Sequence, residues 1–113
     1  MGVFDNNISK PLSITTIGKD IRESCVYYLK EKTRLYNKYG YGIPSSTECE
    51  RDLRGVIQAN FPQRLEDAGV TLWRLAVIKK KSGNAHTSFY IVFYWWDVYH
   101  ECRKLFDCEY EII

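Results

Sequence analysis

Cysteine and histidine are the residues in this sequence whose spacing most directly suggests chemistry. His100 and Cys102 lie two residues apart and Cys108 follows, so together with Cys49 they could supply four ligands to a zinc ion. No two cysteines form a CxxC unit, and the spacing matches no common zinc pattern. We therefore expect no metal site. We expect the four cysteines, Cys25 included, to be free thiols that pack as small hydrophobic residues.

A histidine beside a thiol can also activate a nucleophile. His100 and Cys102 occupy positions i and i+2 of an expected helix, where side chains do not face each other. His86 lies beside Thr87 and Ser88 at an expected hairpin tip, an exposed place that suits catalysis poorly. The sequence contains no phosphate-binding loop, dinucleotide-binding glycine motif or nucleophile elbow. We therefore expect a non-catalytic protein that needs no cofactor.

Hydrophobic periodicity predicts an α+β fold with an N-terminal arm over residues 1–17 and a single domain over 18–113. A long helix is expected over 18–39, where Gly40 ends it. A second helix is expected over 47–59, beginning with a capping box between Thr47 and Glu50. A short helix over 61–68 follows. Asp97 is expected to cap a C-terminal helix over 98–107, and the alternating tail 108–113 fits a further strand.

The dominant feature is an antiparallel hairpin, with strands at about 70–79 and 86–96 closed by Ser82-Gly83 or Gly83-Asn84. With a two-residue turn, both faces become apolar. One face then carries Leu72, Arg74, Ala76, Ile78, Phe89, Ile91, Phe93 and Trp95, and the other carries Trp73, Leu75, Val77, Tyr90, Val92, Tyr94 and Trp96. Because a half-exposed hairpin alternates apolar with polar residues, we expect helices to cover one face and a partner to cover the other.

Aromatic content points to binding, because Tyr and Trp are enriched at protein interfaces. The chain has 9 Tyr, 5 Phe and 3 Trp, many of them within residues 89–99. We expect a small non-catalytic binding protein that self-associates as a homodimer and acts as an adaptor or inhibitor of a larger macromolecular partner. A protein of this size and character is typical of those encoded by phages and mobile elements. The expected contact residues are Trp73, Tyr90, Tyr94, Trp96 and Tyr99.

The N-terminal sequence indicates a cytoplasmic protein. No basic segment is followed there by an apolar one, so no signal peptide is expected. Asn6 replaces the Ser or Thr that a myristoylation motif requires. No apolar run approaches the roughly 18 residues that a membrane span needs.

A second interpretation follows from the order of elements and from Leu65-Glu66-Asp67-Ala68-Gly69-Val70. This order over residues 18–107 resembles winged-helix DNA-binding domains, in which a recognition helix runs into a two-stranded wing. The resemblance implies a transcriptional or replication regulator. Gln63 and Arg64 would then lie near bases, and Lys79, Lys80 and Lys81 at the wing tip would lie on phosphates. Lys30, Arg34 and Lys38 form a further basic edge, although the net charge of +2 does not by itself indicate nucleic acid.

Overall fold

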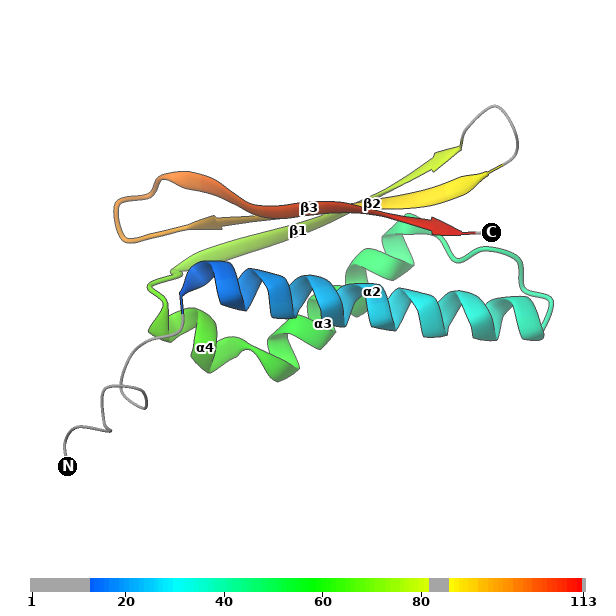
Figure 1. The fold of residues 1–113 in the computed structure, drawn as a ribbon, viewed down its shortest axis with the longest axis horizontal. Helices are drawn as coiled ribbons and strands as arrows, with labels where there is room; N and C mark the ends of the chain where they lie inside the picture. Colours follow the sequence, from blue (N-terminus) through cyan, green and yellow to red (C-terminus); the bar gives the residue numbers. More distant parts are fainter. Residues whose placement is uncertain (1–12, 82–85, 113) are drawn as a thin grey trace.

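The computed structural model describes residues 13–81 and 86–112, which form two layers (Figure 1). Three helices cover one face of a three-stranded antiparallel sheet in which β2 lies between β1 and β3. The helices are α2 (Ile14–Lys38), α3 (Ser46–Asn60) and α4 (Pro62–Asp67), and the strands are β1 (Leu72–Lys81), β2 (Thr87–Trp96) and β3 (Cys102–Ile112). The expected α+β class and long first helix are confirmed. None of the described helices is long and apolar enough to cross a membrane.

Helix α2 begins four residues earlier than expected. The Ser13 side chain accepts a hydrogen bond from the backbone N–H of Thr16, which caps the first turn and draws 14–17 into the helix. The buried stripe of α2 recurs every four residues, at Ile17, Ile21, Cys25 and Leu29. The helix ends before Gly40, whose φ of 72° is the left-handed conformation that glycine adopts without strain.

Helix α3 begins at Ser46, and its cap is Ser45 instead of the predicted Thr47. The Ser45 hydroxyl accepts from the backbone N–H of Glu48 at 3.1 Å. Glu50, expected to close a capping box, reaches β1 instead and accepts from the backbone N–H of Val77 at 3.1 Å. Short helix α4 follows at Pro62, close to the predicted range, and buries Leu65.

The hairpin is present, but the predicted assignment of side chains to its faces is wrong. Lys81 pairs with Thr87, and Leu75 lies opposite Phe93. The two predicted turns, Ser82-Gly83 and Gly83-Asn84, lie outside the described residues. Either two-residue turn would have offset the pairing by an odd number of residues, and such an offset moves every side chain of one strand to the other face.

The predicted C-terminal helix over 98–107 is also wrong, because residues 102–112 form strand β3. Asp97 caps a turn instead of a helix: its carboxylate accepts from the backbone N–H of Tyr99, and His100 has a φ of 62°. Pairing with β3 satisfies the second edge of β2, which would otherwise expose a row of unpaired backbone groups. The expected strand character of the tail is thereby confirmed and extends back to Cys102.

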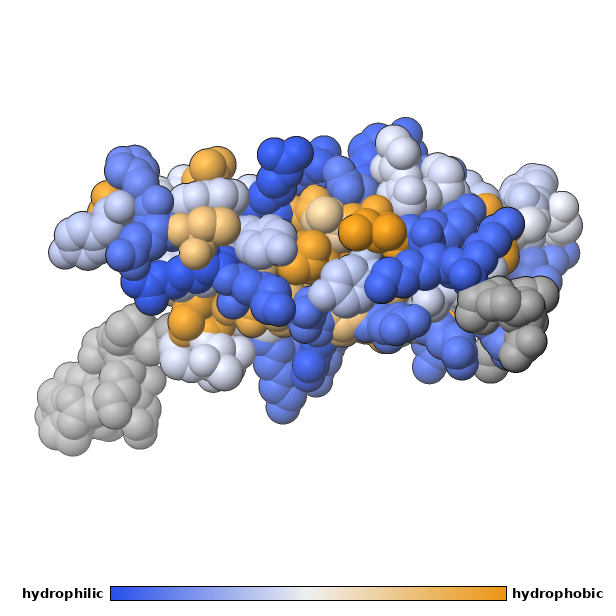
Figure 2. Space-filling view, turned by 90° about the horizontal axis from the view of Figure 1, so that it is seen from above, coloured by the Kyte–Doolittle hydropathy of each residue, from blue (hydrophilic) through white to orange (hydrophobic). Residues whose placement is uncertain are grey.

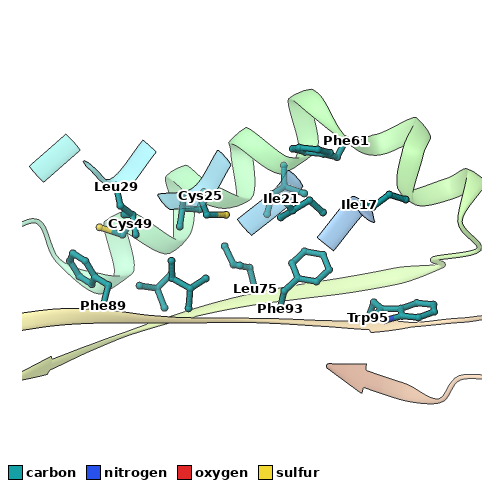
Figure 3. Packing of buried hydrophobic residues seen from close by; sticks show 14 of the residues in the cluster. Ile17, Ile21, Cys25, Leu29, Cys49, Phe61, Leu75, Phe89, Phe93 and Trp95 are labelled. Carbon is teal, nitrogen blue, oxygen red and sulfur yellow. The ribbon is translucent and has the colours of Figure 1, made fainter. Parts of the chain in front are cut away.

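The core lies between the helices and the helix-facing side of the sheet, called here the inner face. Leu75 and Phe93 point from the sheet toward Cys25 and Ile21 of α2, and Phe89 lies below Leu29 and Cys49 (Figure 3). Strand β3 has a bulge, because Phe93 pairs with Phe106 and the next residue, Tyr94, pairs with Lys104. Leu105 between them is therefore an extra residue without a partner on β2. The Leu105 side chain lies against Gly18 so closely that a Cβ at that glycine would come within 2.8 Å of Leu105 Cγ.

The contact between Gly18 and Leu105 gives a prediction about how β3 docks. Gly18→Ala should lower the unfolding free energy by about 1 kcal/mol, because overpacking outweighs the helix propensity that alanine adds. In a Leu105→Ala background, the same change should instead stabilise by about 0.5–1 kcal/mol. Urea unfolding of the four proteins measures both effects.

Gly55→Ala on α3 is the matched control, because nothing lies within 4 Å of a Cβ at that position. It should stabilise in either background. Equal effects of Gly18→Ala with and without Leu105 would show that β3 does not pack on α2 in this way.

Candidate interaction surface

The sheet face turned away from the helices, called here the outer face, has no covering layer among the described residues (Figure 1). Directly paired residues share a face, so the register defines its members. They are Leu72, Arg74, Ala76, Ile78 and Lys80 on β1, Ser88, Tyr90, Val92, Tyr94 and Trp96 on β2, and Cys102, Lys104, Asp107, Glu109 and Glu111 on β3.

Apolar and aromatic side chains run along the outer face. Leu72 is 58% exposed and Ile78 is 48% exposed, while Tyr94 and Trp96 are half-buried beside them. Val92 is buried in the middle of this row, although no helix lies over it. Figure 2 looks onto this side of the molecule, where hydrophobic side chains gather near the middle and hydrophilic ones surround them. A continuous patch of this kind on one face is typical of an interaction site.

Charge is distributed unevenly across the outer face. Strand β1 carries the cations Arg74 and Lys80, whereas the last six residues of β3 carry three carboxylates, Asp107, Glu109 and Glu111. The face therefore has one basic edge and one acidic edge, with the aromatic row of β2 between them.

Hydrogen bonds across the strands hold the central side chains in place. Tyr90 donates to Asp107 at 2.5 Å, and Lys104 Nζ lies 3.0 Å from the same carboxylate. The hydrogen bond from Tyr90, followed by that from Lys104, lowers the pKa of Asp107 below its ordinary value, and the bond to Asp107 raises the pKa of Tyr90. Lys80 Nζ lies 4.7 Å from the centre of the Tyr90 ring. The Tyr90 ring is thus fixed between the basic and acidic edges.

A groove of about 400 Å³ opens where β1 begins, between β1 and α3. It is lined by Arg54, Leu72, Trp73, Arg74 and Trp96. The turn between β2 and β3 lies at the same end of the sheet and presents Val98, 63% exposed, and Tyr99, 80% exposed. The backbone N–H of Thr71 donates to the carbonyl of Trp96 at 2.9 Å and ties the start of β1 to the end of β2.

The structure separates the five predicted contact residues. Tyr90, Tyr94 and Trp96 lie on the outer face, and Tyr99 lies in the adjoining turn. Trp73 lies on the inner face, where it stacks on Phe93 with ring centres 5.4 Å apart.

Sequence reasoning missed Leu72, Ile78 and Val98 as exposed apolar members of this surface. Alternation along β1 was visible, but only the true register says which of its faces is exposed.

The residues predicted to contact nucleic acid lie in three places. Lys30, Arg34 and Lys38 are exposed on α2, where Arg34 pairs with Glu31 at 2.8 Å. Gln63 donates to Asp67, and Arg64 pairs with Asp20 on α2 at 2.5 Å. Lys79, Lys80 and Lys81 end β1, the first of them half-buried and the other two exposed.

The densest group of titratable side chains lies between α2 and α3. Lys32 Nζ is 2.7 Å from both Glu48 and Asp52, and Tyr28 and Tyr36 donate to the same two carboxylates. Partial burial acts to lower the pKa of Lys32, but its hydrogen bonds to Asp52 and Glu48 raise it by more. Lys32 therefore stays protonated at neutral pH, which suits a clamp between helices and not a proton donor or nucleophile.

The cysteines do not converge on one site. Cys25 and Cys49 are buried in the core, and burial raises the pKa of the Cys25 thiol to about 12 and that of Cys49 to about 11. Cys102 is exposed on the outer face, whereas Cys108 packs against the core on the inner face. Within residues 13–81 and 86–112, no three His, Cys, Asp or Glu side chains are grouped so that they could hold a metal ion.

No family model, curated protein or solved structure matches this chain.

The Lys32 clamp predicts a dependence of stability on acid. Hydrogen bonds lower the pKa of Glu48 below 4.5; they also lower that of Asp52 below 3.8, although burial there acts in the opposite direction. Groups with a lowered pKa stabilise the fold above their ordinary pKa, and this stability is lost as pH falls through the folded value. Lys32→Met should cost about 2 kcal/mol at pH 7 and should flatten the loss of stability below about pH 5.

Urea unfolding at a series of pH values tests this prediction. Lys30→Met is the control, because Lys30 is exposed on the same helix. Its profile should follow that of the wild type. A Lys32→Met profile parallel to the wild type would contradict the role of the clamp.

Proposed function

We propose that the protein is a non-catalytic protein-binding module that acts as an adaptor or inhibitor of a larger macromolecular partner. The outer face is its contact surface. The observation that carries this proposal is the row of exposed apolar and aromatic residues on a sheet face with no covering layer among the described elements.

The form of the surface supports this function. Large amphipathic rings at the centre of a patch with charged residues at its rim are the usual anatomy of a protein interface. Tyr90 is already held by Asp107, and Trp96 belongs to a sheet anchored on the core, so little side-chain entropy is lost on binding. Lys32, whose pKa is raised, joins two helices, and the hydrogen bond between Tyr90 and Asp107 joins two strands within the outer face.

Site-specific photo-crosslinking tests the proposal. A photoreactive phenylalanine analogue at Tyr94 should give discrete protein adducts in an extract of the source cells. The same analogue at Tyr27, which is 67% exposed on α2, should give none, because that position lies on the helical layer. Equal adduct patterns from both positions, or no adduct from Tyr94, would contradict a contact role for the outer face.

Nucleic-acid binding is the second candidate, favoured by the position of two basic groups. The last turns of α2, with Arg34 and Lys38, and the end of β1, with Lys80 and Lys81, lie at the same end of the molecule (Figure 1). Cations arranged in this way can contact phosphates without reading sequence. The winged-helix interpretation needs more than this, because Arg64 is paired with Asp20 and α4 has only 6 residues.

A salt-titrated shift assay on mixed duplex DNA decides this candidate. Changing Lys79, Lys80 and Lys81 to Ala should weaken binding and reduce the slope of affinity against salt. Fewer phosphate contacts release fewer counterions from the DNA on binding. Changing Lys19, which is exposed near the start of α2, should leave the slope unchanged. An absence of binding at low salt would rule out a function on DNA.

A further inference from the structure

We propose that a second copy of this chain covers the outer face, stacked face to face about a twofold axis parallel to the strands. This inference rests on the proposed function and names the partner. In this arrangement β1 of one protomer lies over β3 of the other, and the two β2 strands cross at the centre.

The edges of the sheet are poorly suited to pairing with another chain. On β1, the backbone N–H of Val77 is already satisfied by Glu50 of α3. On β3, Asp107, Glu109 and Glu111 lie near the open edge, and a symmetric pairing centred on them would place like charges opposite one another. The outer face is therefore the open part of the sheet that is left for a partner.

This orientation brings a cation of the basic edge opposite a carboxylate of the acidic edge. A twofold axis along the strands places β1 of one protomer over β3 of the other without a shift along the strand direction. Lys80, Ser88 and Glu111 are paired across the three strands and so lie at the same position along that direction. Lys80 of one protomer thus meets the partner's Glu111. At another level Arg74 meets the partner's Lys104, which Asp107 already neutralises at 3.0 Å. An axis perpendicular to the strands would instead stack the basic edge on itself.

The same rotation brings the β2–β3 turn of one protomer to a groove of the other. It carries the partner's β2–β3 turn over the start of β1, beside which the groove lined by Arg54, Leu72 and Trp96 opens. Strand β3 follows this turn, and its first residues lie on the side of β2 that faces away from the helices (Figure 1). Its exposed Val98 and Tyr99 supply apolar and aromatic groups, and the groove's two arginines favour an aromatic ring. Each protomer thus provides one groove and one turn.

The size of the face predicts a weak dimer. Three strands about 4.8 Å apart and about 34 Å long give roughly 500 Å² per protomer. The total of about 1,000 Å² is at the lower end of specific interfaces. Dissociation in the micromolar range is therefore expected, with a contribution from charge that falls as salt rises.

Sedimentation equilibrium of the purified chain tests the proposal, at concentrations of about 1–200 µM that bracket a micromolar constant. An acidic variant carries Lys80→Glu, and a basic variant carries Glu111→Lys. The wild type should dimerise. Each variant alone should dissociate at least tenfold more readily, because like charges then face each other. An equimolar mixture of the two should recover the dimer, which also shows that both variants are folded.

Tyr99→Ser should weaken the wild-type dimer about tenfold, which corresponds to one lost anchor in each half of the interface. Tyr27→Ser on α2 is the matched control and should leave the dimer intact. A dimer that the mixed variants fail to restore would overturn the proposed orientation. A monomeric wild type would overturn the second copy as the partner, and adducts of Tyr94 with another protein would then preserve the broader function.

Discussion

Leu75 lies opposite Phe93 and Val77 lies opposite Ile91 across the β1–β2 pair, and these contacts set what the molecule buries and what it presents. All four residues are buried against the helices. Because side chains alternate along a strand, this pairing places Leu72, Arg74 and Ile78 on the outer face together with Tyr94 and Trp96. A shift of β1 by one residue would turn Arg74 toward the helices and expose Leu75 and Val77.

Strand β3 depends on this pairing and in turn completes the core. Phe106 stacks on Phe93, with ring centres 5.7 Å apart, and Leu105 fills the space left by the missing side chain of Gly18. The bulge that places both residues toward the helices bends the start of β3. The turn with Val98 and Tyr99 thus takes its position from contacts made on the opposite side of the sheet.

The sequence predicted the helices better than the strands, for a physical reason. In α2 the apolar residues recur every four positions over many turns, and only one structure buries them all. Residues 98–107 are ambiguous, because Val98, Cys102, Leu105 and Phe106 fit a helical stripe, whereas only Leu105 and Phe106 face the core in the bulged strand. Whether these residues form a helix or a strand depends on the open edge of β2, and no local sequence pattern reveals that edge.

The interaction surface was predictable only in part, and the missing information was the length of one loop. Tyr90, Tyr94 and Trp96 share a face in any register, so they were found together. Trp73 was grouped with them because a two-residue turn was assumed, whereas the pairing of Lys81 with Thr87 moves it to the core side. Whether the connection between two strands has an odd or an even number of residues therefore decides which aromatic side chains a partner can reach.

The distribution of satisfied groups supports the binding function proposed above. Between the helices, Lys32 is shared by two carboxylates that two tyrosines also contact, so a substrate would have to displace several charged hydrogen bonds at once. On the outer face, cross-strand hydrogen bonds join Tyr90 to Asp107 and Ser88 to Glu109, whereas Leu72 and Ile78 remain open to solvent on the basic edge. A flat partner with complementary charges can cover a surface that has a rigid centre and an exposed apolar margin, and little side-chain entropy is lost when it binds.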